Sequence, residues 1–175
     1  MITLLTGGSK CGKSSIAEGL LNGSSGEKYY IAAMEPYGEE AQRAIARHRE
    51  MRSGKGFRTI ERARNLDTLK LPETGGHCCA LLECLTTLCA NEMFTQTGVT
   101  DPTEKIISGL KNLSGQVGKL VIVTNEVASD GVDYPSETMD YIRIMTRLNA
   151  AVAELSDTVI ECVCGIPLTL KGAPE

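Results

Sequence analysis

Short runs of apolar residues alternate along the chain with longer stretches in which apolar residues recur every three or four positions. Several short runs are apolar throughout, as in strands that are covered on both faces. The longer stretches have the period of amphipathic helices. This alternation predicts an α/β fold, a mostly parallel sheet with helices on both faces. The predicted strands are residues 2–5, 29–33, 78–82, 120–124 and 159–164.

Four helices are predicted between these strands. The first runs from residue 13 towards 22, and the second spans 39–51. A third begins at Asp101-Pro102, because Asp can cap a helix and Pro fits its first turn. Residues 53–74 are expected to form an ordered connection that can hold a short strand at 57–60. The fourth helix follows Pro135 and should pack one side on the sheet, namely Met139, Ile142, Met145, Leu148, Val152 and Leu155.

Composition and charge exclude some classes of function. The 175 residues suit one domain, 1–175, and the apolar share of 42% is ordinary for a folded protein. The chain has 18 Lys and Arg against 22 Asp and Glu, a net charge of -4, and no basic block. It therefore lacks the electrostatic footprint of a protein that binds nucleic acid or a membrane surface. We expect small-molecule partners.

Targeting and cysteine patterns point to the cytoplasm. The first residues lack the basic and apolar regions of a signal peptide, and no apolar run approaches the ~20 residues that span a bilayer. The seven cysteines are odd in number, contain no C-x-x-C pair and lie mostly in apolar runs such as 78–82. We expect buried thiols in a reducing cytoplasm rather than disulfides or metal ligands.

The strongest motif lies between the first predicted strand and the first predicted helix. Residues 7–14 match G-x-x-x-x-G-K-[ST] at every fixed position, which predicts a P-loop and a P-loop NTPase-like domain. Backbone N–H groups of such a loop surround phosphate oxygens, and the helix dipole adds positive potential. Lys13 is expected to act catalytically at the β and γ phosphates and Ser14 to ligate Mg²⁺. The alternative is an ordinary glycine-rich turn. The loop consists of Gly7, Gly8, Ser9, Lys10, Cys11, Gly12, Lys13 and Ser14.

Two acidic residues follow predicted strands. Glu83 comes after 78–82 and is the candidate for the second metal ligand, although a capping or solvated carboxylate is the alternative. Glu126 stands at the corresponding end of 120–124. Because parallel sheets bind ligands outside the carboxyl ends of their strands, we expect both acids to face the nucleotide edge of the sheet.

The second predicted helix carries a histidine among cations. His48 is flanked by Arg43, Arg47, Arg49 and Arg52, and it shares the apolar stripe of the helix with Arg52. A solvated basic face or a buried structural histidine would explain this pattern. The functional alternative is a neutral imidazole, because neighbouring cations disfavour its protonated form. That nitrogen could attack phosphorus while the arginines hold phosphate oxygens.

Further motifs follow the P-loop in order. They are Y-I-A-A at 30–33, I-A-R-H-R-E-M-R at 45–52, F-R-T-I-E at 57–61, L-E-C-L-T at 82–86, V-T-N-E-V at 123–127 and G-I-P-L at 165–168. Together they resemble the bifunctional adenosylcobinamide kinase/adenosylcobinamide-phosphate guanylyltransferase family of cobalamin biosynthesis. The likeness covers nearly the whole chain, and the histidine motif with L-E-C-L-T and T-N-E-V is its most specific part.

The resemblance implies a two-step reaction. His48 would attack the α-phosphate of GTP, release pyrophosphate and hold GMP, which then passes to adenosylcobinamide phosphate. A kinase activity would phosphorylate the aminopropanol hydroxyl of adenosylcobinamide, with Mg²⁺ as cofactor and GTP or ATP as substrate. The resemblance also implies a homotrimer. Nucleotide contacts would fall on the P-loop and on Ala32, Ala33, Met34, Arg49, Glu50, Met51, Arg52, Glu61 and Glu83.

Two segments differ from the pattern of the resembled family. T-N-E-V is followed by a longer stretch, 128–135, before the long helix. The family's F-R-D-x-x-G-x-x-N-Q corresponds to residues 141–150, where only the end with Arg147 and Asn149 is kept. Two alternatives therefore stay open: a P-loop kinase of small molecules without the histidine reaction, and a non-catalytic GTP-binding regulatory protein.

Overall fold

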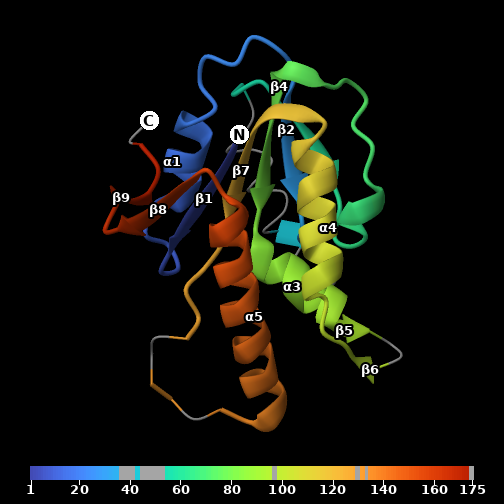
Figure 1. Ribbon diagram of the computed structural model, residues 1–175, viewed down its shortest axis with the longest axis vertical. Coiled ribbons are helices and arrows are strands. Elements are labelled where there is room, and N and C mark those ends of the chain that lie inside the picture. Colours follow the sequence, from blue (N-terminus) through green and yellow to red (C-terminus); the bar gives the residue numbers. More distant parts are fainter. Residues whose placement is uncertain (36–41, 44–53, 96–97, 129–130, 133, 174–175) are drawn as a thin grey trace.

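The computed structural model describes residues 1–35, 42–43, 54–95, 98–128, 131–132 and 134–173. Its main sheet has seven strands in the order β3-β2-β4-β7-β1-β8-β9, and a separate pair is formed by β5 and β6 (Figure 1). Neighbouring strands of the main sheet are parallel except β8 and β9. The strands are β1 Ile2–Gly7, β2 Lys28–Ala32, β3 Phe57–Glu61, β4 Gly75–Glu83, β5 Phe94–Thr95, β6 Gly98–Val99, β7 Val117–Val123, β8 Thr158–Val163 and β9 Ile166–Lys171.

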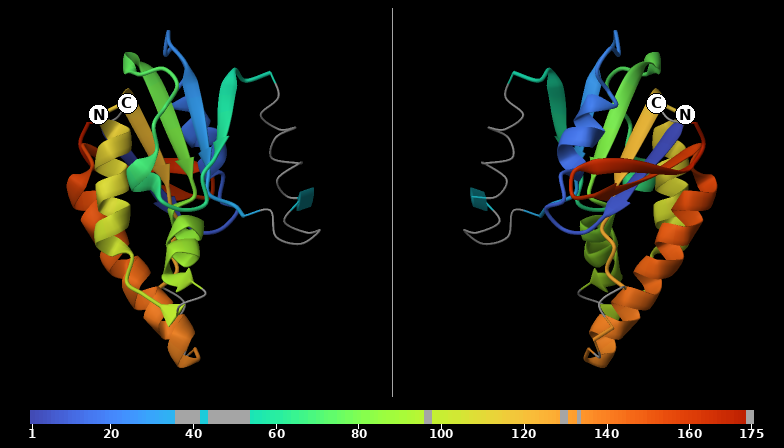
Figure 2. Two further views of the ribbon diagram at one scale, coloured as in Figure 1. Left: turned by 90° about the vertical axis from the view of Figure 1, so that its right-hand side faces the viewer. Right: turned by 90° about the vertical axis from the view of Figure 1, so that its left-hand side faces the viewer.

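Helices cover both faces of this sheet. The helix α1 (Lys13–Gly19) packs on one face, whereas α3 (Leu85–Met93), α4 (Thr103–Ser114), α5 (Ser136–Leu155) and the 3-10 turn η1 (Leu66–Thr68) contribute to the core on the other. Figure 2 shows α4 and α5 side by side along that second face. The α/β, mostly parallel architecture predicted from the sequence is confirmed.

Two core layers explain why the strands are apolar throughout. Successive residues of β1 point to opposite faces, so Leu4 belongs to the layer under α4 and α5 and Leu5 to the layer under α1. The same alternation places Leu82 and Leu81 of β4 in different layers. Each fully buried leucine contributes about 1.5–3 kcal/mol of transfer free energy. An alternating polar face would have left one layer without a core.

The helix boundaries follow local capping. The carboxylate of Asp101 accepts a hydrogen bond from the Thr103 backbone N–H at 3.0 Å, as the predicted helix start requires. The helix α1 ends at Gly19 rather than near residue 22. Its chain tightens there, because the N–H groups of Leu21 and Asn22 bond to carbonyls only three residues back. The predicted face of α5 is confirmed from Met145 onward, where Met145, Leu148 and Val152 are buried, whereas Met139 and Ile142 are only partly buried and do not belong to the core.

Other expectations had mixed outcomes. The short strand expected at 57–60 is β3, and the connection 53–74 is ordered over its described part, 54–74. The strand β9 and the helix α3 were not predicted. The expected helix at 39–51 lies outside the described residues except for 42–43. None of the described helices has the length and apolar character needed to cross a bilayer.

All seven cysteines are free thiols, but they are not all buried. Cys11 and Cys84 are half-buried, and Cys164 is exposed at the turn between β8 and β9. The expectation of burial was therefore wrong for Cys164. It is confirmed for Cys78, Cys79, Cys89 and Cys162.

Candidate nucleotide-binding site

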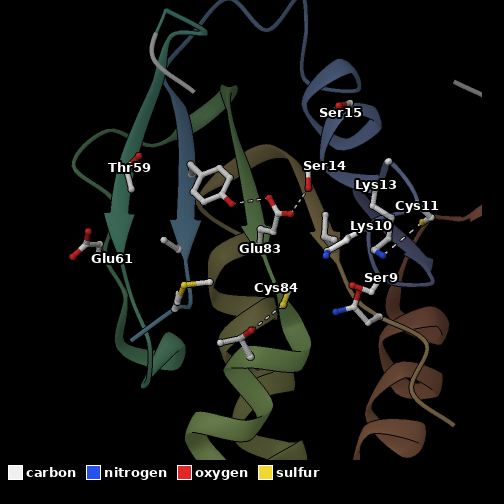
Figure 3. Close-up of a pocket in the computed structure, with 17 residues that line it drawn as sticks. Ser9, Lys10, Cys11, Lys13, Ser14, Ser15, Thr59, Glu61, Glu83 and Cys84 are labelled. Carbon is white, nitrogen blue, oxygen red and sulfur yellow. Dashed lines mark hydrogen bonds between the residues drawn. The ribbon is translucent and has the colours of Figure 1, made fainter. Parts of the chain in front are cut away.

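A cavity of about 540 Å³ lies between the P-loop and the carboxyl ends of β2, β3 and β4 (Figure 3). That volume is within the usual range for a small-molecule site. Its position is where parallel sheets bind ligands. The cavity is lined by Ser9, Lys10, Cys11, Gly12, Lys13, Ser14, Ser15, Tyr30, Ala32, Met34, Thr59, Glu61, Glu83, Cys84, Thr87, Val123 and Asn125.

The P-loop runs from the end of β1 into α1 and depends on two glycines. Gly7 has φ +140°, and a Cβ there would lie 2.4 Å from the carbonyl oxygen of Cys162 on β8. Gly12 has φ +100° immediately before α1, a conformation that residues with side chains rarely adopt. Cys162 in turn donates from Sγ to the carbonyl oxygen of Cys11 at 3.0 Å, and burial raises the pKa of its thiol. The loop is thus packed directly against β8.

Lys13 lies beneath the loop. Its side chain is almost fully buried, and Nζ donates to the carbonyl oxygens of Gly7 at 2.9 Å and Gly8 at 2.5 Å. Cys11 Sγ is 3.7 Å from the same nitrogen. These contacts hold the positive charge at the centre of the loop, where it faces the cavity that it lines. A cation in this position would meet the phosphates of a nucleotide.

Glu83 at the end of β4 connects two other lining residues. Its Oε1 accepts a hydrogen bond from the Ser14 hydroxyl, and its Oε2 accepts one from the Tyr30 hydroxyl at 2.6 Å. Figure 3 shows this carboxylate between the P-loop and β2. The register places Glu83 opposite Ala32 of β2, so both strands end at the cavity. The structure therefore brings together the two predicted metal ligands, Ser14 and Glu83.

The remaining predicted contacts divide into three groups. Ala32, Met34 and Glu61 line the cavity. Ala33 does not, because its side chain is buried in the core under α4 and α5 and its N–H donates to the Glu83 carbonyl oxygen. Gly7 and Gly8 contribute carbonyls to Lys13 rather than lining atoms. His48, Arg49, Glu50, Met51 and Arg52 lie outside the described residues.

Glu126 lies at the nucleotide edge of the sheet, as expected, because its backbone N–H donates to the carbonyl oxygen of Gly7 in the P-loop at 3.2 Å. Its side chain is exposed, does not line the cavity and accepts a hydrogen bond from the backbone N–H of Ala128 at 2.8 Å. The chain turns after β7, so the carboxylate closes this local turn instead. Asn125, one residue earlier, lines the cavity in its place.

Sequence reasoning missed several lining residues, because their position depends on pairing between distant strands. Tyr30 and Thr59 are neighbours across β2 and β3, which no local pattern indicates. Asn125 is held by a network behind the cavity: its Nδ2 donates to Thr86 Oγ1 at 3.1 Å, and its carbonyl oxygen accepts from Asn149 Nδ2 at 3.3 Å. The T-N-E-V motif contains both residues, but an acidic side chain was expected at this edge, so Glu126 was selected instead of Asn125.

Comparison with known proteins identifies the family. Residues 3–170 match the family described as cobinamide kinase / cobinamide phosphate guanyltransferase. The chain is 31% identical to the bifunctional adenosylcobalamin biosynthesis protein CobU of Escherichia coli (strain K12), over 98% of this chain and 100% of the relative. The chain belongs to this family. CobU of Salmonella typhimurium is also 31% identical, with the same coverage, and the corresponding protein CobP of Pseudomonas aeruginosa is 30% identical over 99% of both chains.

Solved structures support the fold alone. An ATPase from the type III secretion system of pathogenic bacteria superposes with a TM-score of 0.50 and 13% identity, over 91% of this chain. This chain spans 50% of that longer structure. A protein of Pyrococcus horikoshii OT3 superposes with a TM-score of 0.54 and 11% identity, over 99% of this chain and 87% of the other.

Within this member of the cobinamide kinase / guanyltransferase family, the altered segment 141–150 has structural contacts. Asn149 Oδ1 accepts from Thr124 Oγ1 at 2.8 Å, and the Tyr141 hydroxyl donates to the Thr86 carbonyl oxygen at 3.1 Å. Burial raises the pKa of Tyr141, which keeps its hydroxyl a donor. Arg147 pairs with Asp101 at 2.7 Å on the surface. Asn149 thus holds α5 against the segment that carries Asn125, Tyr141 joins α5 to α3, and Arg147 joins it to the start of α4.

Proposed function

We propose that this protein transfers GMP from GTP to adenosylcobinamide phosphate, giving adenosylcobinamide-GDP and pyrophosphate, and that it also phosphorylates adenosylcobinamide. The observation that supports this most directly is the cavity in which Lys13, Ser14 and Glu83 converge, in a chain of the cobinamide kinase / guanyltransferase family. The nucleotide contacts of the proposal are the P-loop with Ala32, Met34, Glu61 and Glu83, together with Arg49, Glu50, Met51 and Arg52.

Mg²⁺ fits the donor set at the base of the P-loop. Ser14 and Glu83 offer a hydroxyl and a carboxylate oxygen in direct contact, and Mg²⁺ prefers such hard oxygen ligands. The ion would supply charge stabilisation at the phosphates. Lys13 adds a fixed positive charge under the loop, and Tyr30 keeps the second oxygen of Glu83 occupied. GTP and ATP are the proposed substrates.

His48 is the proposed nucleophile. A ring nitrogen would form a bond to the α-phosphorus as the bond to the bridging oxygen breaks, and pyrophosphate leaves. A phosphate oxygen of adenosylcobinamide phosphate then bonds to the same phosphorus, the P–N bond breaks, and the imidazole is released. Lys13 and the loop N–H groups would hold the β and γ phosphates, which form the leaving group in this half of the reaction.

A homotrimer belongs to the same proposal. The edge strand β9 is exposed along its whole length, and Ile166 and Leu170 are 61% and 62% exposed. An apolar edge strand of this kind invites pairing with another chain. Sedimentation equilibrium should give a trimer for wild type and a smaller species for Leu170→Lys. A wild-type monomer would contradict the proposed trimer.

We propose a reducing, cytoplasmic location, which the free thiols support.

The test uses purified protein, GTP, Mg²⁺ and adenosylcobinamide phosphate. Without corrinoid, we expect at most one equivalent of pyrophosphate per protein, released as His48 takes up GMP. With corrinoid present, turnover should continue and give pyrophosphate and adenosylcobinamide-GDP in equal amounts, with strong loss in Lys13→Ala. A matched control is Lys111→Ala, because Lys111 lies in the last turn of α4, away from the cavity. A second assay with adenosylcobinamide and ATP or GTP measures the kinase activity. Absence of corrinoid-dependent pyrophosphate would overturn the transferase function.

A further inference from the structure

A second cluster of chemically active side chains lies where β4 begins. Glu73, His77 and Cys78 each place one potential ligand atom within 4.8 Å of the other two. His77 Nε2 is 3.1 Å from Glu73 Oε1, and Cys78 Sγ is 3.9 Å from the same oxygen. None of these residues lines the nucleotide cavity. The cluster is separate from that site, because β4 carries Glu83 about 20 Å further along at ~3.3 Å per residue.

An irregularity in β4 makes this convergence possible. In a regular strand, adjacent residues such as His77 and Cys78 point to opposite faces. Here the pairing of β4 with β7 shifts register between Gly75 and Cys79. Such irregularities redirect individual side chains and are frequent next to functional sites. As a result, the half-exposed imidazole and the buried thiol approach the same carboxylate.

The imidazole of His77 is held between two glycines. A Cβ on Gly26 would lie 2.3 Å from His77 Cδ2, and a Cβ on Gly75 would lie 2.8 Å from His77 Cε1. The N–H of Gly26 also donates to the His77 carbonyl oxygen at 3.1 Å. Because neither glycine carries a Cβ, the ring can lie against their backbone with Nε2 3.1 Å from Glu73 Oε1.

Glu73 is also fixed, through its backbone. The Tyr29 side chain is fully buried, and its hydroxyl donates to the Glu73 carbonyl oxygen at 3.0 Å and accepts from the Glu73 N–H at 2.9 Å. Cys78 is held within β4 and is 1% exposed. All three ligand-bearing residues therefore sit on anchored backbone, which lowers the entropic cost of closing them around an ion.

We propose that Glu73, His77 and Cys78 form a binding site for a thiophilic divalent transition-metal ion, best matched by Zn²⁺. Carboxylate oxygen, imidazole nitrogen and thiolate sulfur are the three ligand types of zinc sites, with bonds of about 2.0–2.3 Å. Tetrahedral coordination with such bonds separates ligand atoms by about 3.3–3.7 Å. The present separations need only small side-chain rotations to reach that range. The Cys78 thiol releases its proton when the ion binds.

The fourth position would be open to solvent. The side chains of His77 and Glu73 are 52% and 55% exposed, so an ion held here remains accessible from one side. Three protein ligands with an open position can take a water molecule or an exchangeable small ligand. This inference does not depend on the proposed transferase activity.

The test titrates Co²⁺, a spectroscopic substitute for Zn²⁺, into untagged protein that has been freed of metal, with excess Mg²⁺ to occupy oxygen-ligand sites. We expect one equivalent to bind with a thiolate-to-cobalt band in the near ultraviolet, which one equivalent of Zn²⁺ abolishes. Cys78→Ser should lose the band, and His77→Gln and Glu73→Gln should each weaken binding by about tenfold or more. Cys164→Ser, which removes the exposed thiol, is the matched control and should retain it.

Two results would overturn the site. One is a wild-type titration without the thiolate band. The other is a band that survives in Cys78→Ser or that has unchanged affinity in both His77→Gln and Glu73→Gln. Because the side chains of Glu73 and His77 are half exposed, these two variants keep the test informative even where Cys78→Ser perturbs the core. Circular dichroism of each variant checks the fold.

Discussion

Ser14 and Glu83 are 69 positions apart in the chain, yet the hydroxyl of the first donates a hydrogen bond to the carboxylate of the second. This contact joins the first turn of α1 to the end of β4. It places an uncharged and a charged oxygen side by side at the floor of the cavity, where the P-loop meets the sheet. The proposed metal site rests on this pair.

Removal of the Glu83 charge should impair catalysis while the fold is retained. Glu83→Gln keeps the shape of the side chain but gives Mg²⁺ a weaker ligand. We expect kcat/KM for GTP to fall about 100-fold or more, because metal-ion charge stabilisation amounts to several kcal/mol and each 1.4 kcal/mol is tenfold. Glu126→Gln is the matched control, an exposed carboxylate that the sequence also nominated. Equal effects of the two substitutions would contradict the assignment.

Tyr30 should act as a positioning residue. Its hydroxyl donates to Glu83 Oε2 at 2.6 Å and leaves Oε1 towards Ser14. Partners that orient a metal ligand are worth about 10- to 100-fold in metal affinity or activity. Tyr30→Phe should therefore raise the Mg²⁺ concentration needed for half-maximal rate, with partial recovery in excess Mg²⁺. Tyr134→Phe, at an exposed tyrosine before α5, is the control. An unchanged Mg²⁺ dependence in Tyr30→Phe would argue against this role.

Thiol reactivity should follow burial. Desolvation raises the pKa of Cys89 to about 12, so at pH 8 only about one molecule in 10⁴ carries the thiolate. The fraction grows as pH rises towards that value. Iodoacetamide at pH 8 should modify the exposed Cys164 first and leave Cys89 intact in the folded protein, as followed by mass spectrometry of digested samples. Early modification of Cys89 would mean that α3 is not packed as described.

The carboxyl group of Asp101, at the start of α4, should have a pKa below the usual range for aspartate. Hydrogen bonds from Thr103, with a smaller contribution from Arg147, hold the pKa of Asp101 below its ordinary value of 3.8. A folded-state pKa below the unfolded one stabilises the fold above pH 3.8, and this contribution is lost as pH falls through the folded value. Carbon-detected NMR of the Asp101 carboxyl should give a midpoint under 3.8. A midpoint at or above that value would refute the capping interaction.

The parts of the fold that could be predicted are those determined by residues close together in the sequence. The P-loop, five parallel strands and the face of α5 are visible in short patterns of apolar residues and glycine. The strand β9 has a short sequence signal, the alternation of Ile166, Leu168 and Leu170 with polar or small residues after Cys164-Gly165. In the structure, Cys164 and Gly165 form a turn in which both φ angles are positive. Such turns join antiparallel hairpins, whereas the parallel pattern favoured a chain without one.

The helix α3 and part of the site were harder to predict. The buried face of α3 includes the polar residues Thr86 and Glu92 beside Leu85, Leu88 and Met93, so the sequence of this segment shows only a weak amphipathic period. Glu83 could be nominated because an acid directly after an apolar strand is the usual metal-side group of a P-loop protein. Tyr30 could not, because its role arises from the pairing of β2 with β4. Contacts between distant strands leave no local trace.

The most direct test of the account is covalent labelling with GTP that carries the label at its α-phosphate. With Mg²⁺ present, wild type should acquire one GMP in an acid-labile, base-stable adduct, and His48→Ala should acquire none while it still binds GTP. Addition of adenosylcobinamide phosphate should discharge the label into adenosylcobinamide-GDP. Wild-type protein that remains unlabelled, or a label that persists in His48→Ala, would contradict the central claim.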